Sequence, residues 1–113
     1  MSESKVRCII KRPDERYGHV TNISTSLKNL QKTVGGDIER VTLVPGHSVI
    51  LCNEEGKIRG LPHNIFFRGY PFFDNIVGDL IVIGVDEEAE DFTDLDMSFT
   101  AWKELLREWG NDE

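Results

Sequence analysis

The sequence predicts an α+β fold, in which a small and mainly antiparallel sheet of about five strands carries a short helix after its second strand and an amphipathic C-terminal helix. Two observations lead to this prediction. Five short runs are rich in β-branched and apolar residues and are separated by turn-forming stretches. Two other segments repeat apolar residues at the three- and four-residue spacing of a helix face. The length of 113 residues corresponds to a single domain, spanning 1–113.

Five runs are expected to be strands: 6–11, 19–23, 38–44, 47–52 and 79–85. The first two flank a turn-rich stretch and should form a hairpin. The run 47–52 is apolar on both faces, which is typical of a strand inside a sheet rather than at its edge. We therefore place it centrally.

The first helix is expected where Leu27, Leu30 and Val34 share one face. The hydroxyl side chains of residues 24–26 offer N-caps, because they can accept hydrogen bonds from free backbone N–H groups. Gly35-Gly36 is expected to end the helix, since glycine adopts the left-handed conformation without steric cost.

The C-terminal helix is predicted by a second apolar stripe, made of Phe99, Trp102, Leu106 and Trp109. Thr93 together with Asp96, or Asp96 alone, is expected to cap its start, and Gly110 is expected to end it.

Charge is unevenly distributed along the chain. The net charge is −7, and the acidity is concentrated in residues 86–113, while the first 85 residues are close to neutral. A chain without a general basic surface is not expected to bind nucleic acids as a class.

No run approaches the roughly 18 apolar residues of a membrane span, and the start lacks the apolar core of a signal peptide. We therefore expect a cytoplasmic protein without a membrane partner, whose Cys8 and Cys52 are reduced, buried thiols.

The segment 53–64 is the densest polar stretch of the chain. Its Glu54-Glu55-Gly56-Lys57 portion predicts a hairpin turn with a positive φ at Gly56, in which the charges are simply solvated. Alternatively, the polar side chains form a set of donors and acceptors for a small ligand or a partner backbone. The candidate ligand-binding residues here are Asn53, Glu54, Lys57, Arg59 and Asn64.

An aromatic segment follows, over residues 65–73, and Gly69 and Pro71 argue against one regular element there. Two interpretations stay open. In one, Phe66, Phe72 and Phe73 complete the core from a loop. In the other, Phe67, Arg68 and Tyr70 form an exposed patch for a protein partner, a second subunit or a flat ring, so that Phe67 or Tyr70 would assist ligand binding.

Catalytic and metal chemistry find little support in the sequence. His47, Cys52 and His63 lack the paired short spacing of a structural zinc site, so no metal and no cofactor are expected. There is no Gly-x-Ser-x-Gly motif and no glycine loop that precedes a helix to cradle phosphate. An enzyme with an unrecognised site therefore remains only a secondary alternative.

The acidic run and the last helix form a second candidate surface. It could contact a basic groove on a protein partner by mimicking a polyanion. The candidate partner-binding residues are Asp86, Glu87, Glu88, Glu90, Asp91, Lys103 and Arg107. The alternative is that these charges are solvated and that the two cations pair with nearby carboxylates of the helix or the acidic run.

Three segments, taken together, resemble a family of small proteins classed as a domain of unknown function and found in bacteriophages and mobile elements. They are the VGGxIE sequence at 34–39, the NEEGKxxxLPxN sequence at 53–64, and the segments 75–78 and 81–84 with the later EDFTDL sequence at 90–95. The resemblance implies an accessory protein of a phage or mobile element that acts by binding, in the cytoplasm of the host cell. It brings no catalytic residues.

We therefore expect a non-catalytic binding module that sequesters a small nucleotide-like ligand, with a counter-defence or host-modulating role and a possible homo-oligomeric state. The alternative is an inhibitor that binds a host defence protein through its acidic C-terminal region.

Overall fold

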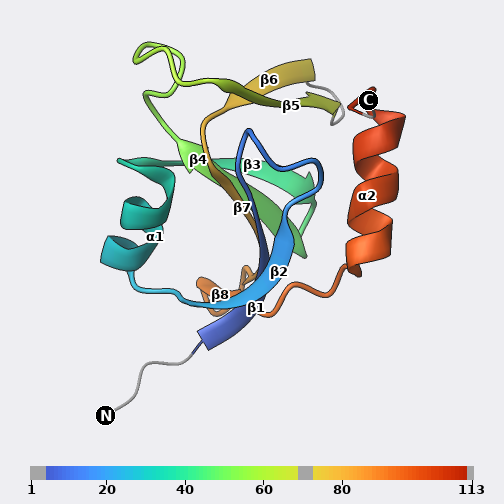
Figure 1. The fold of residues 1–113 in the computed structure, drawn as a ribbon. Helices are drawn as coiled ribbons and strands as arrows, with labels where there is room; N and C mark the ends of the chain where they lie inside the picture. The colour runs from blue at the N-terminus through green and yellow to red at the C-terminus, as the bar shows by residue number, and fades with distance from the viewer. Residues whose placement is uncertain (1–4, 69–72, 112–113) are drawn as a thin grey trace.

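The computed structural model describes residues 5–68 and 73–111, except for the side chain of Phe73. Figure 1 shows a central sheet with a helix on either side. The elements are β1 (Lys5–Lys11), β2 (His19–Ser24), α1 (Leu27–Val34), β3 (Ile38–Val44), β4 (Ser48–Asn53), β5 (His63–Arg68), β6 (Phe73–Val77), β7 (Leu80–Asp86), β8 (Asp91–Thr93) and α2 (Phe99–Glu108). The predicted α+β class is confirmed. None of the described helices has the length and apolar composition to cross a membrane.

The main sheet has the order β2-β1-β7-β4-β3, and its neighbours are antiparallel. The five predicted strands are the five strands of this path, and β1 and β2 form the predicted hairpin. β4 lies between β3 and β7, and all six of its residues are buried, so its expected interior position is confirmed.

Side chains alternate between two cores, one on each face of the sheet, because successive residues of a strand point to opposite sides. On β4, Val49 and Leu51 pack with Leu30 and Val34 of α1. Ile50 and Cys52 belong to the opposite core, which also holds residues of α2, β5 and β6. Both faces of the interior strands are therefore covered, which explains why β4 and β7 read as continuous apolar runs.

The aromatic segment is more regular than predicted. β5 and β6 pair antiparallel as a separate two-stranded sheet. Gly69, Pro71 and Phe72 fall outside the described residues, between these two strands. The prediction that this segment is not one regular element is confirmed, but the two strands on either side of the interruption were not predicted.

The acidic run also contains a strand that the sequence does not predict. β8 pairs with β7 through Gly84↔Thr93 and Val85↔Phe92. Gly84 allows the chain after β8 to lie close to β7, since a Cβ at this position would lie 2.3 Å from the backbone oxygen of Asp94. Thr93 is therefore part of the sheet and cannot cap α2, and this predicted cap is wrong.

The two helices begin and end through side-chain and glycine caps. Ser26 accepts a hydrogen bond from the Asn29 N–H at the start of α1, and Gly35 ends that helix with φ 84°, as predicted. Leu27, however, is 63% exposed, so the buried stripe of α1 is shorter than the sequence indicates. The cap of α2 is Ser98 rather than Asp96.

The C-terminal stripe is confirmed in its main part. Trp102 and Leu106 are completely buried, Trp109 is nearly so, and Phe99 packs at the margin of the same core. Gly110, with φ 88°, follows the last turn as predicted. The helix therefore docks on the sheet through these aromatic and aliphatic side chains.

Candidate functional site

The polar loop between β4 and β5 is not a hairpin turn. β4 belongs to the main sheet and β5 to the smaller one, so the two strands do not pair. Gly60, with φ 70°, takes the positive backbone angle that was predicted for Gly56. Gly56 is instead required for close packing, because a Cβ there would lie 2.8 Å from Cγ2 of Val77.

Two of the predicted ligand-binding residues are buried amides that hold the chain together. Asn53 donates from Nδ2 to the Val34 carbonyl at 3.2 Å and accepts at Oδ1 from the Glu55 N–H at 2.8 Å. Asn64 donates from Nδ2 to the carbonyls of Lys11 and Gly78, at 2.8 Å and 2.7 Å. Because these polar groups are paired within the protein, their observed role is structural.

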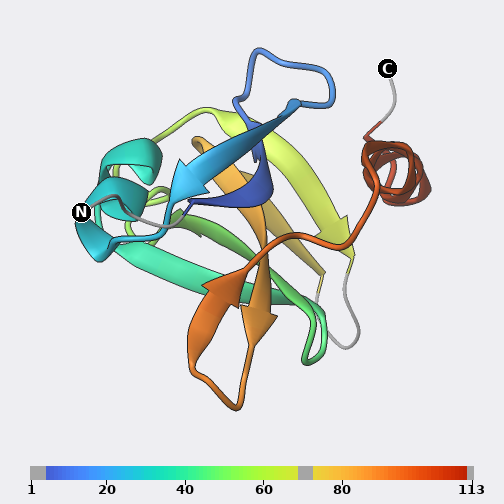
Figure 2. The ribbon, with the colours of Figure 1, turned by 90° about the horizontal axis from the view of Figure 1, so that it is seen from below.

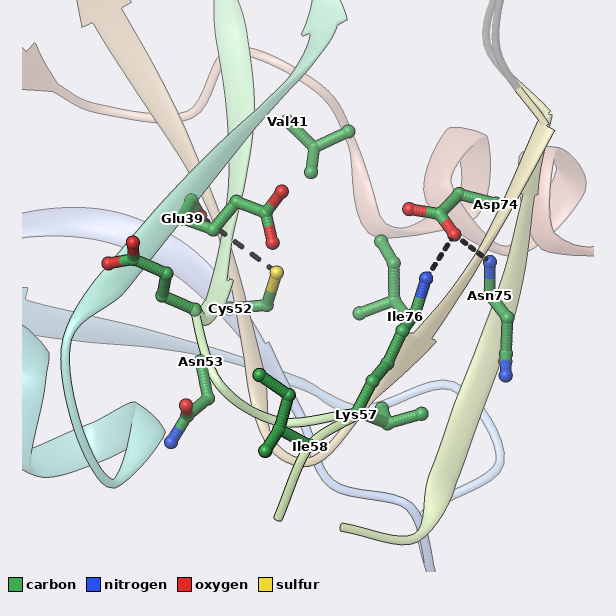
Figure 3. Close-up of a pocket in the computed structure, with 11 residues that line it drawn as sticks. Glu39, Val41, Cys52, Asn53, Lys57, Ile58, Asp74, Asn75 and Ile76 are labelled. Carbon is green, nitrogen blue, oxygen red and sulfur yellow. Dashed lines mark hydrogen bonds and ion pairs between the residues drawn. The ribbon is translucent and has the colours of Figure 1, made fainter. Parts of the chain in front are cut away.

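Lys57 lies on the wall of a cavity of about 200 Å³ between β3, β4, β6 and the polar loop (Figure 3). Its Nζ atom forms an ion pair with Oδ1 of Asp74 at 2.6 Å. This hydrogen bond raises the pKa of Lys57. Burial raises the pKa of Asp74, but the hydrogen bonds from Lys57 and the Asn75 N–H outweigh burial and lower it. Both groups are therefore charged at neutral pH.

Two further carboxylates, those of Glu39 and Glu54, line the same cavity. The apolar part of its wall includes Val41 and Ile76. Figure 3 shows the Glu39 carboxylate on one side of the hollow and the Lys57 ammonium on the other. The cavity thus combines one cation, three carboxylates and an apolar surface.

Arg59 lines a different cavity, of about 280 Å³, on the other side of Asn53. Its Nη1 atom donates to the Gly35 carbonyl at 2.9 Å. Lys32 and Asp79 line the same space. The structure therefore separates Lys57 from Arg59, which the sequence grouped in one site, and Asn53 forms part of the wall of both cavities.

Of the acidic residues that the structure describes, Asp79 alone lines the Arg59 cavity, and its charge is partly offset. Its Oδ2 atom lies 3.7 Å from Nε of Arg12. Burial raises the pKa of Asp79, with a further increase from Asp14 and Glu15 and an opposing decrease from Arg12. Among the described residues that line this cavity, the two cations Lys32 and Arg59 therefore outnumber the one carboxylate, in contrast to the cavity beside Lys57.

Two of the aromatic candidates, Phe66 and Phe67, lie opposite to the interpretations that named them. Phe67 is 2% exposed and packs edge-on against Trp109, with 5.1 Å between ring centroids. Phe66, which was considered for the core, is 43% exposed. Arg68 is exposed at the end of β5, and Tyr70 lies outside the described residues. Phe67 is therefore a core residue and cannot stack on a ligand.

The five acidic candidates lie on the hairpin between β7 and β8, which projects from the body of the protein in Figure 2. The carboxylates of Asp86, Glu87, Glu88, Glu90 and Asp91 are all exposed. A hollow of about 410 Å³ lies beside the hairpin and is also lined by Arg40 and Phe92. Arg40 lies 3.7 Å from Glu87 and stacks over the Phe92 ring.

The two cationic candidates on α2 lie far from this hairpin in both ribbon views (Figures 1 and 2). Lys103 is half-buried, with its Nζ atom 5.4 Å from the ring centroids of both Tyr17 and Phe99. Arg107 is exposed near the end of the helix. The predicted partner surface is thus divided into two separate parts.

The cysteine and histidine candidates do not come together as ligands. Within residues 5–68 and 73–111, no three histidine, cysteine, aspartate or glutamate side chains are grouped to hold a metal ion. Burial raises the pKa of Cys52 to about 12 and that of Cys8 to about 11, so both are protonated thiols.

Several residues that define the cavities were not singled out by their sequence. Glu39 and Asp74 border the Lys57 cavity, and Lys32 and Asp79 border the Arg59 cavity. Each is an ordinary charged residue in its local context, and it becomes part of a site only through the packing of distant segments.

The comparison with protein families shows the family of this chain. No curated protein and no solved structure matches it. A family model described as Domain of unknown function (DUF3846) matches residues 6–107, nearly the whole chain. The segments that carry the sequence resemblance also meet in space, because Asn53 bonds to Val34 and Asn64 to Gly78. The chain belongs to the DUF3846 family of domains of unknown function.

Proposed function

We propose that this chain is a non-catalytic binding module of phage or mobile-element origin that sequesters a small nucleotide-like anion and so modulates a host defence or regulatory pathway. The site we propose is the cavity beside Arg59. The observation that carries the proposal is the positive balance of charge in that cavity.

Among the described residues, two cations and one carboxylate line this site. Lys32, Arg59 and Asp79 line the cavity, and Arg12 pairs with Asp79 from outside its wall. A phosphate group is attracted to such a position and repelled from the Lys57 cavity, where carboxylates outnumber cations. The positive potential therefore favours the Arg59 side for an anionic ligand.

Arg59 also has donors to spare. A guanidinium has five N–H donors, and the Gly35 carbonyl accepts from Nη1 at 2.9 Å. The remaining donors can bind a phosphate in the bidentate geometry that arginine favours. The volume of about 280 Å³ is at the lower limit of small-molecule pockets. We therefore propose that the phosphate end of the ligand enters the cavity while its base stays outside.

Isothermal titration calorimetry with mono- and cyclic nucleotides and with inorganic phosphate tests this site. Arg59→Gln and Lys32→Gln should each weaken binding by about tenfold or more, because each removes a charged contact. Asp79→Asn should strengthen binding. Lys57→Gln is the matched control, since it removes a cation from the neighbouring cavity and should leave affinity unchanged.

Absence of heat and of any shift in melting temperature with all nucleotides would contradict the proposed ligand class. Mass spectrometry of small molecules released from the denatured protein offers an independent check, because a sequestered ligand should co-purify. Native mass spectrometry of the same sample would establish whether the protein is a homo-oligomer.

The proposed biological role is tested by gene neighbourhood. A location among early genes of a phage would agree with counter-defence. A location within a housekeeping operon would be incompatible with it, whatever the ligand.

The projecting hairpin between β7 and β8 favours a second function, inhibition of a host defence protein. Its five exposed carboxylates form a localised acidic surface that is suited to a basic groove. Neutralising Asp86, Glu87, Glu88, Glu90 and Asp91 should abolish capture of the host protein. Neutralising Glu104 and Glu108, which are exposed on α2, is the control and should leave capture intact. Capture that survives loss of the hairpin charges would exclude polyanion mimicry.

A further inference from the structure

We propose that the cavity beside Lys57 binds a small zwitterionic amino acid, with the ligand carboxylate at Lys57, its ammonium group at Glu39, and a small apolar side chain against Val41 and Ile76. This site is separate from the Arg59 cavity, and the inference does not depend on the proposed function.

The arrangement of opposite charges carries the inference. Glu39 projects from β3 and Lys57 from the polar loop, and Figure 3 shows their charged ends facing each other across the hollow. The two are close enough for the Glu39 charge to raise the pKa of Lys57. A molecule that carries an ammonium and a carboxylate on the same carbon atom can satisfy both walls, whereas a simple anion or cation satisfies only one.

Lys57 can accept a ligand without losing its present partner. An ammonium group has three donors, and Asp74 engages the lysine through one contact at 2.6 Å. The lysine side chain remains 60% exposed, so the other donors are accessible. Asp74 positions the ammonium at the cavity wall, although its own charge opposes an incoming carboxylate.

The ammonium end of the ligand has acceptors available on the opposite wall. In the described part of the chain, the carboxylates of Glu39 and Glu54 make no hydrogen bond or ion pair. Both line the cavity, and both are exposed and therefore hydrated. A ligand ammonium would replace this water with charge-assisted hydrogen bonds.

The remaining surface limits the size and polarity of the ligand. The volume is about 200 Å³, and Val41, Ile76 and Val77 contribute apolar wall. This space suits an aliphatic side chain of three or four carbon atoms better than a large aromatic ring. The excess of carboxylates excludes phosphorylated ligands, which distinguishes this cavity from the one beside Arg59.

Titration of isotope-labelled protein with valine, followed by chemical shifts in NMR spectra, tests the proposal. Isobutylamine lacks the carboxylate of valine, and 3-methylbutanoate lacks its ammonium group, so both should bind at least about tenfold more weakly. Perturbed signals should include those of Glu39, Lys57 and Ile76.

Lys57→Met and Glu39→Gln should each weaken valine binding by about tenfold or more, while Lys57→Arg should retain it. Asp74→Asn should strengthen binding, because it removes the charge that competes for the lysine. Arg59→Gln is the control and should have no effect, so that failure here is distinguishable from failure of the nucleotide proposal. Circular dichroism would verify that each variant is folded.

Two results would overturn the inference. One is the absence of saturable shifts with valine and other aliphatic amino acids. The other is equal affinity for isobutylamine and valine, which would indicate a simple cation site without a role for Lys57.

Discussion

Lys11 and Asn64 are 53 residues apart in the chain, yet Nζ of Lys11 donates to Oδ1 of Asn64 at 2.6 Å in the protein interior. The Asn64 amide completes this contact by donating from Nδ2 to the Lys11 carbonyl at 2.8 Å. A buried lysine is thus held by a buried amide, which joins β1 to the start of β5.

Replacement of Asn64 by alanine should strongly destabilise the protein. The change removes the acceptor of the Lys11 ammonium and the donor to the carbonyls of Lys11 and Gly78. A loss of about 3 kcal/mol in the free energy of unfolding is expected, since buried polar groups are left unpaired. Urea unfolding would measure it. Asn22→Ala, on the exposed side of β2, is the control and should change stability by less than about 0.5 kcal/mol.

Lys11 should make the free energy of unfolding depend on pH in the alkaline range. Burial lowers its pKa from 10.5, although Glu15 and Asp14 act in the opposite direction. Between the lowered pKa and 10.5, the unfolded chain binds a proton that the native protein has lost, so stability rises with pH in this window. The free energy of unfolding of wild type minus that of Lys11→Met should therefore increase as the pH rises from the lowered native pKa toward 10.5. A flat or falling difference would contradict burial of the ammonium.

The cap of α2 distinguishes the structure from the sequence prediction. Ser98 accepts a hydrogen bond at Oγ from the Ala101 N–H at 3.0 Å. Ser98→Ala should reduce the free energy of unfolding by about 1 kcal/mol, whereas Asp96→Ala should have almost no effect. Thermal or chemical denaturation of the two variants would measure the difference. The reverse order would place the helix start at Asp96.

The two thiols should be unreactive in the native protein. Burial raises their pKa to about 11 for Cys8 and about 12 for Cys52, and the nucleophile in thiol chemistry is the thiolate. Ellman's reagent at about pH 8 should label neither cysteine in the folded state and both in denaturant. Cys52 lines the Lys57 cavity, so its rapid labelling without denaturant would mean that this cavity opens in the native protein.

Local patterns predicted most of the secondary structure because they act over a few residues. The apolar run 47–52 indicated an interior strand, and the stripe of Trp102, Leu106 and Trp109 indicated the face of α2 that docks on the sheet. Gly35 and Gly110 marked helix ends through their positive φ angles. These features depend on backbone sterics and on side-chain periodicity, both of which can be read from sequence.

The candidate site was predicted less well because polar residues near each other in sequence can face different spaces. Lys57 and Arg59 are two positions apart and border different cavities. Asn53 and Asn64 were expected to bind a ligand, but they satisfy backbone groups of distant segments instead. Hydrogen-bonding capacity is visible in a sequence, whereas the partner that uses it is not.

Sequence alone determined the fold class, the single acidic region and the family membership of this protein, because these depend on composition, periodicity and motif order. Tertiary structure decided how the charges are distributed between cavities. It placed Glu39 opposite Lys57 and Lys32 beside Arg59 by packing β3, α1 and the polar loop around Asn53. Electrostatic potential depends on distances in space, and the fold alone sets the distances between residues that are far apart in the chain.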